Sequence, residues 1–233
     1  MRSRQDPDPA QASLLESYGG PWFVPEEVRG AIRLAESYLL FLALLPDEAD
    51  ARDLAQYGQR CCDAHHLKHP LPPERLHITL LPLMGFPRGL PIPQLIIDAA
   101  KDAATSVARL PPIPVTLDSV QSMGKDHYAL ALCCGTGSQR AITVLQRTLA
   151  QALKRRGLGP QAAGGTAHMS ICYHNASPIQ SYPILDAPSF TTRRLALLLS
   201  HRGNSHYEHV AEWRLIKQRA GLAARESHTK YGS

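Results

Sequence analysis

Apolar and polar positions follow two periods along the chain, one typical of strands and one typical of helices. The apolar run 38–45 has the length and continuity of a buried strand. Asp47 is then a suitable N-cap for a helix over 48–67. After a proline-rich stop, the alternating segment 75–81 predicts a second strand. The first folded part of the chain is therefore expected to be a strand, a helix and a strand.

The rest of the chain continues this alternation. Apolar residues spaced three or four apart, from Ile142 to Leu153, predict an amphipathic helix that begins near Ser138. The remaining predicted elements are a helix over 92–110 and strands over 115–121, 128–134, 167–173, 194–200 and 206–215. Each helix is expected to bury its apolar stripe against a sheet.

Two of the predicted strands carry the same polar pattern. Successive side chains of a strand point to opposite faces, so His77 and Thr79 share the polar face of the strand that follows the proline-rich stop. His168 and Ser170 share the polar face of 167–173 in the same way. A histidine and a hydroxyl group therefore project together from one strand in each half of the sequence.

This repetition predicts a duplicated α+β fold. The chain contains two strand–helix–strand units of similar size, separated near 135–137. We expect a bilobal body with two antiparallel sheets facing a central cleft and helices on the outside, in which the lobes meet along the two polar strands. The expected boundaries are an N-terminal extension at 1–35, the two-lobed domain at 36–217 and a flexible C-terminal tail at 218–233.

Composition indicates a globular protein. With 44% hydrophobic residues among 233, the chain can bury a sizeable core. No uninterrupted apolar run is long enough to cross a membrane, and the first residues, MRSRQDPDPAQAS, lack the apolar region of a secretion signal. The five cysteines include two vicinal pairs, which suits free thiols in a reducing compartment. We therefore expect a cytoplasmic protein without membrane association and, by default, a monomer.

The charge favours polyanionic partners without requiring them. The formal net charge is +5 and the isoelectric point is about 9.0. Lysines and arginines near phosphates gain affinity by releasing counterions. Part of the excess, however, lies in the run 154–156, which fits a solvated helix end equally well.

The paired histidines indicate acid–base chemistry, and such a pair suits in-line attack at phosphorus. Histidine titrates near neutral pH, so one neutral imidazole can take a proton from a nucleophile while a second, protonated one gives a proton to the leaving oxygen. The hydroxyl groups of Thr79 and Ser170 can donate hydrogen bonds to the non-bridging oxygens, where negative charge develops. His77 and His168 are thus the candidate catalytic residues, and no metal or other cofactor is expected.

Several segments resemble one known family. The two H-x-[ST] motifs at 77–79 and 168–170 resemble those of the 2H phosphoesterase superfamily. Their surroundings are similar to its branch of LigT-like 2'-5' RNA ligases and RNA 2',3'-cyclic phosphodiesterases. The resemblance extends over about 36–216 and includes FLALLPDE at 41–48, PPERLHITL at 72–80, Gly85 and the closing strand at 207–215.

The resemblance implies hydrolysis of RNA 2',3'-cyclic phosphate ends to 2'-phosphate, with 2'-5' RNA ligation as a related activity of the same groups. It favours His168 as the base, although the residues themselves leave open which histidine is acid and which is base. One departure affects the substrate. The family branch commonly has an arginine after the second motif, whereas here Ile171, Cys172 and Tyr173 follow Ser170.

Two alternatives to an RNA enzyme stay open at this point. One is a phosphodiesterase for a small cyclic nucleotide, and the other is a catalytically silent module that binds RNA ends. Tyr173 and Tyr207 are candidates for stacking on a base, against the alternative of partly buried sheet tyrosines. Lys125 and Arg202, at predicted turns, are candidate phosphate contacts.

A second group of residues has a weaker claim to function. Two cysteines and three histidines between 61 and 69 have helical spacing that could form a metal site, but a histidine-rich helix end is favoured by the helix dipole without any ion. We therefore expect no metal there. The remaining candidates are interpreted as exposed histidines at strand ends: His174, His201, His206 and His209.

Overall fold

The computed structural model describes residues 37–87, 91–124, 128–158, 165–201 and 206–216, so the expected N-terminal extension and C-terminal tail lie outside it. Within these ranges the structure contains nine strands, three α-helices and one 3-10 helix. In chain order they are β1 (Ser37–Leu45), α3 (Glu48–Ala64), η1 (Pro73–Arg75), β2 (Ile78–Pro87), α4 (Gln94–Val107), β3 (Ile113–Met123), β4 (Tyr128–Cys134), α5 (Thr136–Lys154), β5 (His168–His174), β6 (Tyr182–Pro183), β7 (Ser189–Thr192), β8 (Arg194–His201) and β9 (His206–Arg214).

The predicted elements are present, with shifted ends. The main difference is at 75–81, where the strand begins only at Ile78. Pro73 favours the start of a short helix because its ring fixes φ, and η1 continues to Arg75. His77 therefore lies in the short connection between a 3-10 turn and a strand. The short strands β6 and β7 were not predicted.

All strands pair antiparallel, in the order β6-β3-β4-β5-β2-β1-β8-β9, with β7 also on β3. Two multi-stranded halves, each built from long ladders, meet at β2 and β5. A single residue pair, Ile78 with Met169, joins these two strands. The α+β class and the expected junction of two antiparallel sheets along the two polar strands are both confirmed.

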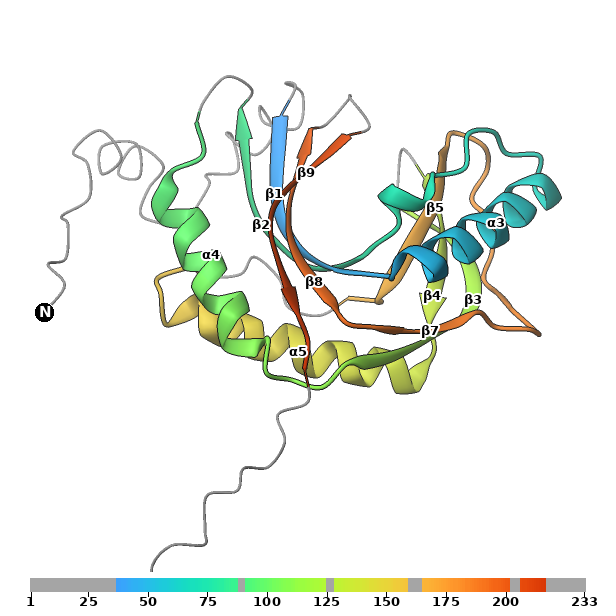
Figure 1. Cartoon of the computed structure of the whole chain (residues 1–233). Helices are drawn as coiled ribbons and strands as arrows, with labels where there is room; N and C mark the ends of the chain where they lie inside the picture. The colour runs from blue at the N-terminus through green and yellow to red at the C-terminus, as the bar shows by residue number, and fades with distance from the viewer. Residues whose placement is uncertain (1–36, 88–90, 125–127, 159–164, 202–205, 217–233) are drawn as a thin grey trace, which may run out of the picture.

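The lobes do not correspond to the two halves of the sequence, which corrects the division expected near 135–137. β8 and β9, late in the chain, extend the sheet of β1 and β2, while β4, from the first half, pairs with both β3 and the later β5. Figure 1 shows the early β1 in the same sheet as the late β8 and β9, with β8 next to β1. Apolar runs mark strands but do not specify their partners.

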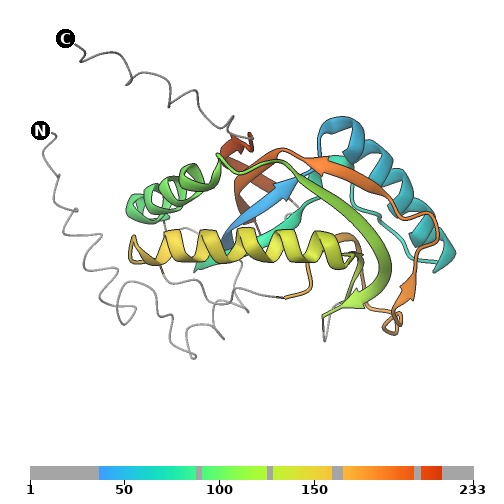
Figure 2. The same cartoon turned by 90° about the horizontal axis from the view of Figure 1, so that it is seen from below.

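The helices α4 and α5 cover one face of this sheet (Figures 1 and 2). The predicted stripe on α5 is buried, from Ile142 at 0% exposure to Leu153 at 0%. Gln146, also buried on α5, donates a hydrogen bond of 3.0 Å to the carbonyl oxygen of Leu80. Leu80 is an extra residue of β2 at a register shift against β1, so its carbonyl lies outside the regular ladder. A side chain of α5 thus provides the hydrogen bond for the carbonyl oxygen at the bulge, one residue after Thr79.

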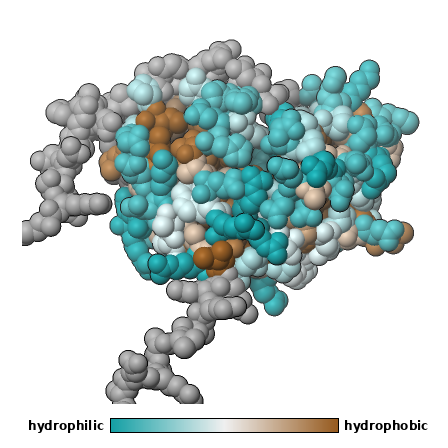
Figure 3. Space-filling model, viewed as in Figure 1, coloured by the Kyte–Doolittle hydropathy of each residue, from teal (hydrophilic) through white to brown (hydrophobic). Residues whose placement is uncertain are grey.

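The third helix, α3, packs against the other lobe. Gly58 allows a close approach to β5, because a Cβ atom added there would lie 3.1 Å from the Cβ atom of Ile171. The large apolar side chains left exposed are scattered over different elements, including Leu95 on α4 and Val144 on α5. In Figure 3 the hydrophobic patches are accordingly separated by hydrophilic surface. No helix in the described ranges is long and apolar enough to cross a membrane.

Candidate active site

His77 is oriented by the turn that precedes β2. Its Nδ1 atom lies 2.9 Å from the backbone carbonyl oxygen of Arg75. A carbonyl oxygen can only accept a hydrogen bond, so Nδ1 carries the hydrogen and donates. The neutral ring is thereby held in the tautomer whose Nε2 atom has a free lone pair.

His168 is held by the same local arrangement at the start of β5. Its Nδ1–H donates to the carbonyl oxygen of Thr166 at 2.7 Å. In both cases the acceptor is the residue two positions earlier. The backbone therefore fixes the tautomer of both neutral histidines identically, and both rings keep Nε2 for chemistry.

The strand pairing brings the two motifs together. Ile78 and Met169 are paired antiparallel. Continuing this register by one residue in each direction sets His77 across from Ser170, and Thr79 across from His168. The apolar neighbours of the four polar residues are buried, at 0–2% exposure for Leu76, Ile78, Leu80, Met169 and Ile171. All four polar residues thus lie on the same side of the junction, as predicted.

The surroundings keep His77 neutral. Burial lowers the pKa of His77 from 6.5 to about 4, against the hydrogen bond to Arg75, which raises it. The positive charge of Arg75 and the neighbouring His168 lower this pKa further. At neutral pH His77 is therefore uncharged and able to accept a proton.

Two aromatic rings account for this burial. The centroid of Phe41, on β1, lies 5.2 Å from that of His77, and the centroid of Tyr207, on β9, lies 5.1 Å away at an interplanar angle of 88°. The two aromatic rings also contact each other edge to face at 5.8 Å. The predicted site residue Tyr207 therefore forms part of an apolar wall around His77.

Tyr173 joins the site because of a bulge. Ala131 pairs with Ser170 while its neighbour Leu130 pairs with Cys172, so Ile171 is an extra residue of β5. Strict alternation would place Tyr173 opposite to Ser170, but the extra residue reverses the phase. Burial and Tyr207 raise the pKa of the Tyr173 phenol, whereas Arg75 and a hydrogen bond with Ser170 lower it. Tyr173 therefore contacts groups from both lobes.

One residue of the site was missed by the sequence analysis. The guanidinium carbon of Arg75 lies 5.2 Å from the ring centroid of Tyr207, a cation–π arrangement. Arg75 precedes His77 by two positions, so the same alternation that selected His77 and Thr79 could have indicated it. The candidate phosphate contacts Lys125 and Arg202 lie outside the described residues.

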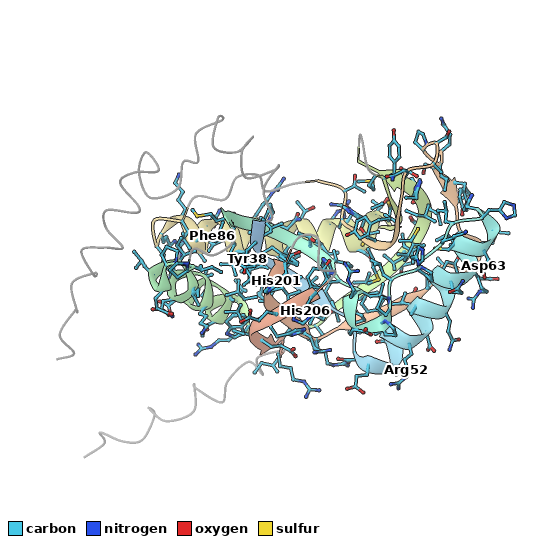
Figure 4. The ribbon with its side chains drawn as sticks, turned by 90° about the horizontal axis from the view of Figure 1, so that it is seen from above. Tyr38, Arg52, Asp63, Phe86, His201 and His206 are labelled. Atoms are coloured by element: carbon cyan, nitrogen blue, oxygen red, sulfur yellow. The ribbon has the colours of Figure 1, made fainter. Side chains whose placement is uncertain are left out.

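The other histidines lie apart from this pair. His206 and His209 are exposed, as expected, but His174 and His201 are partly buried. His174 contacts the hydroxyl group of Ser122 at 3.1 Å, and His201 packs edge to face on Tyr38 with ring centroids 4.8 Å apart. In Figure 4 Tyr38, His201 and His206 lie together, away from Arg52 and Asp63 of α3. The prediction that all four are exposed was thus wrong for His174 and His201, because residues of neighbouring strands partly cover these two side chains.

The cysteine- and histidine-rich stretch does not assemble into a ligand set. No group of three or more histidine, cysteine or acidic side chains that could hold an ion is found in the part of the chain described. Cys61 and Cys62 are buried, and the Nε2 atom of His65 lies 2.9 Å from the hydroxyl oxygen of Tyr182. These side chains take part in packing between α3 and its neighbours.

Comparison with known proteins identifies the family. The family model of the 2'-5' RNA ligase superfamily matches residues 45–204, more than half of the chain. The chain therefore belongs to this superfamily, the 2H phosphoesterases, as the two motifs indicated. The superfamily is one of phosphoesterases and RNA ligases, which supports an enzyme of this kind. A search of curated proteins gave no match.

Solved structures confirm the fold. A phosphoesterase crystal structure matches with a TM-score of 0.58 at 18% identity, covering 77% of this chain and 99% of that one. The protein TT0787 of Thermus thermophilus has a TM-score of 0.57 at 18% identity, with 78% and 100% covered. E. coli LigT, solved with 3'-AMP, has a TM-score of 0.56 at 17% identity, also with 78% and 100% covered.

Proposed function

We propose that this protein hydrolyses RNA 2',3'-cyclic phosphate ends to 2'-phosphates, using His77 and His168 and no metal ion. The observation that carries this proposal is the matched pair of Nδ1 hydrogen bonds, to Arg75 and Thr166, which leaves both Nε2 atoms available at one junction. A base and an acid on two abutting strands suit in-line displacement at phosphorus.

The different surroundings of the two rings support a division of roles. His77, whose pKa is lowered to about 4, is neutral in the free enzyme and acts as the base. It removes a proton from water as the water oxygen bonds to phosphorus. His168 donates its proton to the 3'-oxygen as the bond from phosphorus to that oxygen breaks. The products are a 2'-phosphate and a 3'-hydroxyl, and this assignment differs from the one that the resemblance favoured.

The hydroxyl groups of Thr79 and Ser170 complete the proposed mechanism. Negative charge gathers on the non-bridging oxygens in the transition state, and donors already placed nearby stabilise it. Thr79, of the first motif, lies across from His168 of the second, and Ser170, of the second motif, lies across from His77 of the first. The two histidine–hydroxyl pairs are therefore arranged nearly symmetrically about the junction. If a 5'-hydroxyl replaces water as the nucleophile, the same proton transfers produce a 2'-5' linkage.

A small cyclic nucleotide is the second candidate substrate. E. coli LigT, which shares the fold, was solved with 3'-AMP and with ATP. Among the described residues the aromatic groups near the two motifs are Phe41, Tyr173 and Tyr207, a small set that suits recognition of a terminal nucleotide. Competition between a cyclic-ended oligonucleotide and a nucleoside 2',3'-cyclic phosphate separates the two candidates, because an RNA enzyme prefers the longer substrate.

The proposed activity is tested with an RNA oligonucleotide that ends in a 2',3'-cyclic phosphate, incubated with the protein in EDTA. The expected product is the 2'-phosphate, identified by its mass and by its resistance to an enzyme that removes only 3'-phosphates. Formation of the 3'-phosphate, or a requirement for an added divalent ion, would contradict the proposed mechanism.

A further inference from the structure

Arg75 is an unusual cation near the two motifs. Its guanidinium lies over Tyr207 of β9 and acts electrostatically on both His77 and Tyr173, which belong to different lobes. The side chain is partly buried, and its Nε atom is fully buried. A positive charge is therefore held beside the junction of the two motifs.

Nothing in the described part of the chain balances this charge. Several other arginines form ion pairs, for example Arg194 with Glu212 at 2.7 Å and Arg156 with Asp102 at 3.4 Å. Arg75 forms no such pair with a described carboxylate, and its buried Nε–H has no hydrogen-bond acceptor. A buried donor without an acceptor and an uncompensated charge both cost free energy. An anion bound beside Arg75 would offset that cost.

The backbone and the side chain of Arg75 contribute separately. The carbonyl oxygen accepts the Nδ1–H of His77 and fixes its tautomer, and this oxygen is present with any residue at position 75. η1 holds this backbone rigidly between Pro72 and β2. A side-chain substitution therefore removes the guanidinium while leaving the backbone support of His77 in place.

We propose that Arg75 binds the phosphate of the substrate directly, as the principal cation of the active site. A guanidinium presents several N–H donors in a planar fork that matches phosphate oxygens, and the guanidinium of Arg75 already lies over the ring of Tyr207. Arg75 thereby provides, from the first motif, a positive charge that no arginine directly after Ser170 provides. The inference rests on the proposed phosphoesterase function and names the residue that recognises the reacting group.

The test compares Arg75→Gln with Arg60→Gln. Arg60, on α3, also lies over a tyrosine, with its guanidinium carbon 5.1 Å from the ring centroid of Tyr57, but it is exposed and belongs to a helix that carries neither motif. Both variants lose one positive charge and one cation–π contact. We expect Arg75→Gln to lower kcat/KM for a nucleoside 2',3'-cyclic phosphate by about 10²-fold, while Arg60→Gln has no effect.

Binding of a nucleoside 2'-monophosphate, measured by calorimetry, gives a readout that is independent of turnover. Losing a charge-assisted hydrogen bond is expected to weaken this binding by about tenfold or more in Arg75→Gln. Arg75→Lys should restore part of the affinity because it restores the charge. Arg75→Met, which keeps the apolar stem against Tyr207, replaces the glutamine variant if that variant unfolds.

The outcomes separate this inference from the proposed function. If the wild type binds the monophosphate and Arg75→Gln or Arg75→Met binds it equally well, Arg75 does not contact phosphate and the inference is wrong. If the wild type does not hydrolyse cyclic phosphates, the proposed function fails, while the binding comparison still decides the role of Arg75. A purely structural role would weaken binding in Arg75→Lys as much as in Arg75→Met.

Discussion

At the scale of single residues, the two histidines share a tautomer but differ in their surroundings. Both donate Nδ1–H to a carbonyl oxygen two residues earlier, whereas only His77 is enclosed by Phe41 and Tyr207. This enclosure lowers the pKa of His77 to about 4, so His77 is the ring assigned the role of base.

This assignment predicts how each variant responds to the leaving group. Bis(p-nitrophenyl) phosphate expels p-nitrophenolate, which needs no proton. We expect His168→Ala to lose about 10²–10⁴-fold activity on a cyclic phosphate but much less on the aryl diester. His77→Ala should lose activity on both substrates because each needs a base. If His77→Ala, and not His168→Ala, kept its activity on the aryl diester, His77 would be the acid and His168 the base.

The lowered pKa of His77 also predicts a dependence of stability on pH. The unfolded chain binds a proton at this histidine below about pH 6.5, whereas the folded chain binds it only near pH 4. The contribution of neutral His77 to the free energy of unfolding is therefore fully present above pH 6.5 and is lost as the pH falls to about 4. Urea unfolding between these values should show a smaller loss of stability in His77→Gln than in the wild type, and equal losses would mean that His77 is not shielded.

Some of the site residues could be predicted from the alternation of polar and apolar residues, and others could not. Alternation alone placed Thr79, His168 and Ser170 on the polar sides of their strands and His77 on the same side just before β2, because burial of their neighbours fixes the phase. It could not place Tyr173, since an extra residue at Ile171 reverses that phase. Arg75 was missed because its significance lies in stacking on Tyr207, a residue distant in the sequence.

At the scale of elements, contacts between helices and strands hold the irregular positions beside the site. The carbonyl oxygen of Leu80, released from the ladder by the bulge in β2, accepts its hydrogen bond from Gln146 of α5. Neither the bulge nor this partner could be predicted from periodicity. The bond connects the packing of α5 with the position of Thr79.

Gln146→Leu should accordingly destabilise the protein and reduce its activity. The substitution leaves a buried carbonyl oxygen without a donor, at an expected cost of about 1–3 kcal/mol in the free energy of unfolding. Gln151→Leu, at an exposed position of the same helix, is the matched control. Denaturant unfolding and kcat/KM measure the two effects. Equal stability of the two variants would show that the bond to Leu80 contributes little.

At the scale of the whole molecule, the lobes interleave the two halves of the chain. β1 is bordered by β2 on one side and by β8, about 150 positions later, on the other. The three described helices and the seven longer strands followed from the sequence, whereas the short β6 and β7 and the long-range pairings did not, because similar apolar strands can pair in many orders. The contact of Tyr207 with His77 is therefore formed only when the C-terminal strands have joined the first sheet.

This topology predicts that neither half folds alone. A fragment covering 1–135 lacks β5, β8 and β9, so β1 and β4 each lose a neighbouring strand. We expect such a fragment to show no cooperative thermal transition by circular dichroism, and to regain structure when mixed with the fragment 136–233. Cooperative unfolding of the first fragment by itself would show that the lobes are independent units.

The central claim is that His77 and His168 together catalyse cleavage of a cyclic phosphate. The most direct test is the initial rate of opening of an RNA 2',3'-cyclic phosphate in EDTA, measured for the wild type, His77→Ala, His168→Ala and the control His206→Ala, which changes an exposed histidine of β9. We predict turnover by the wild type and the control, and a loss of about 10²-fold or more in each of the other two. Folded variants that keep wild-type rates would show that the active site lies elsewhere.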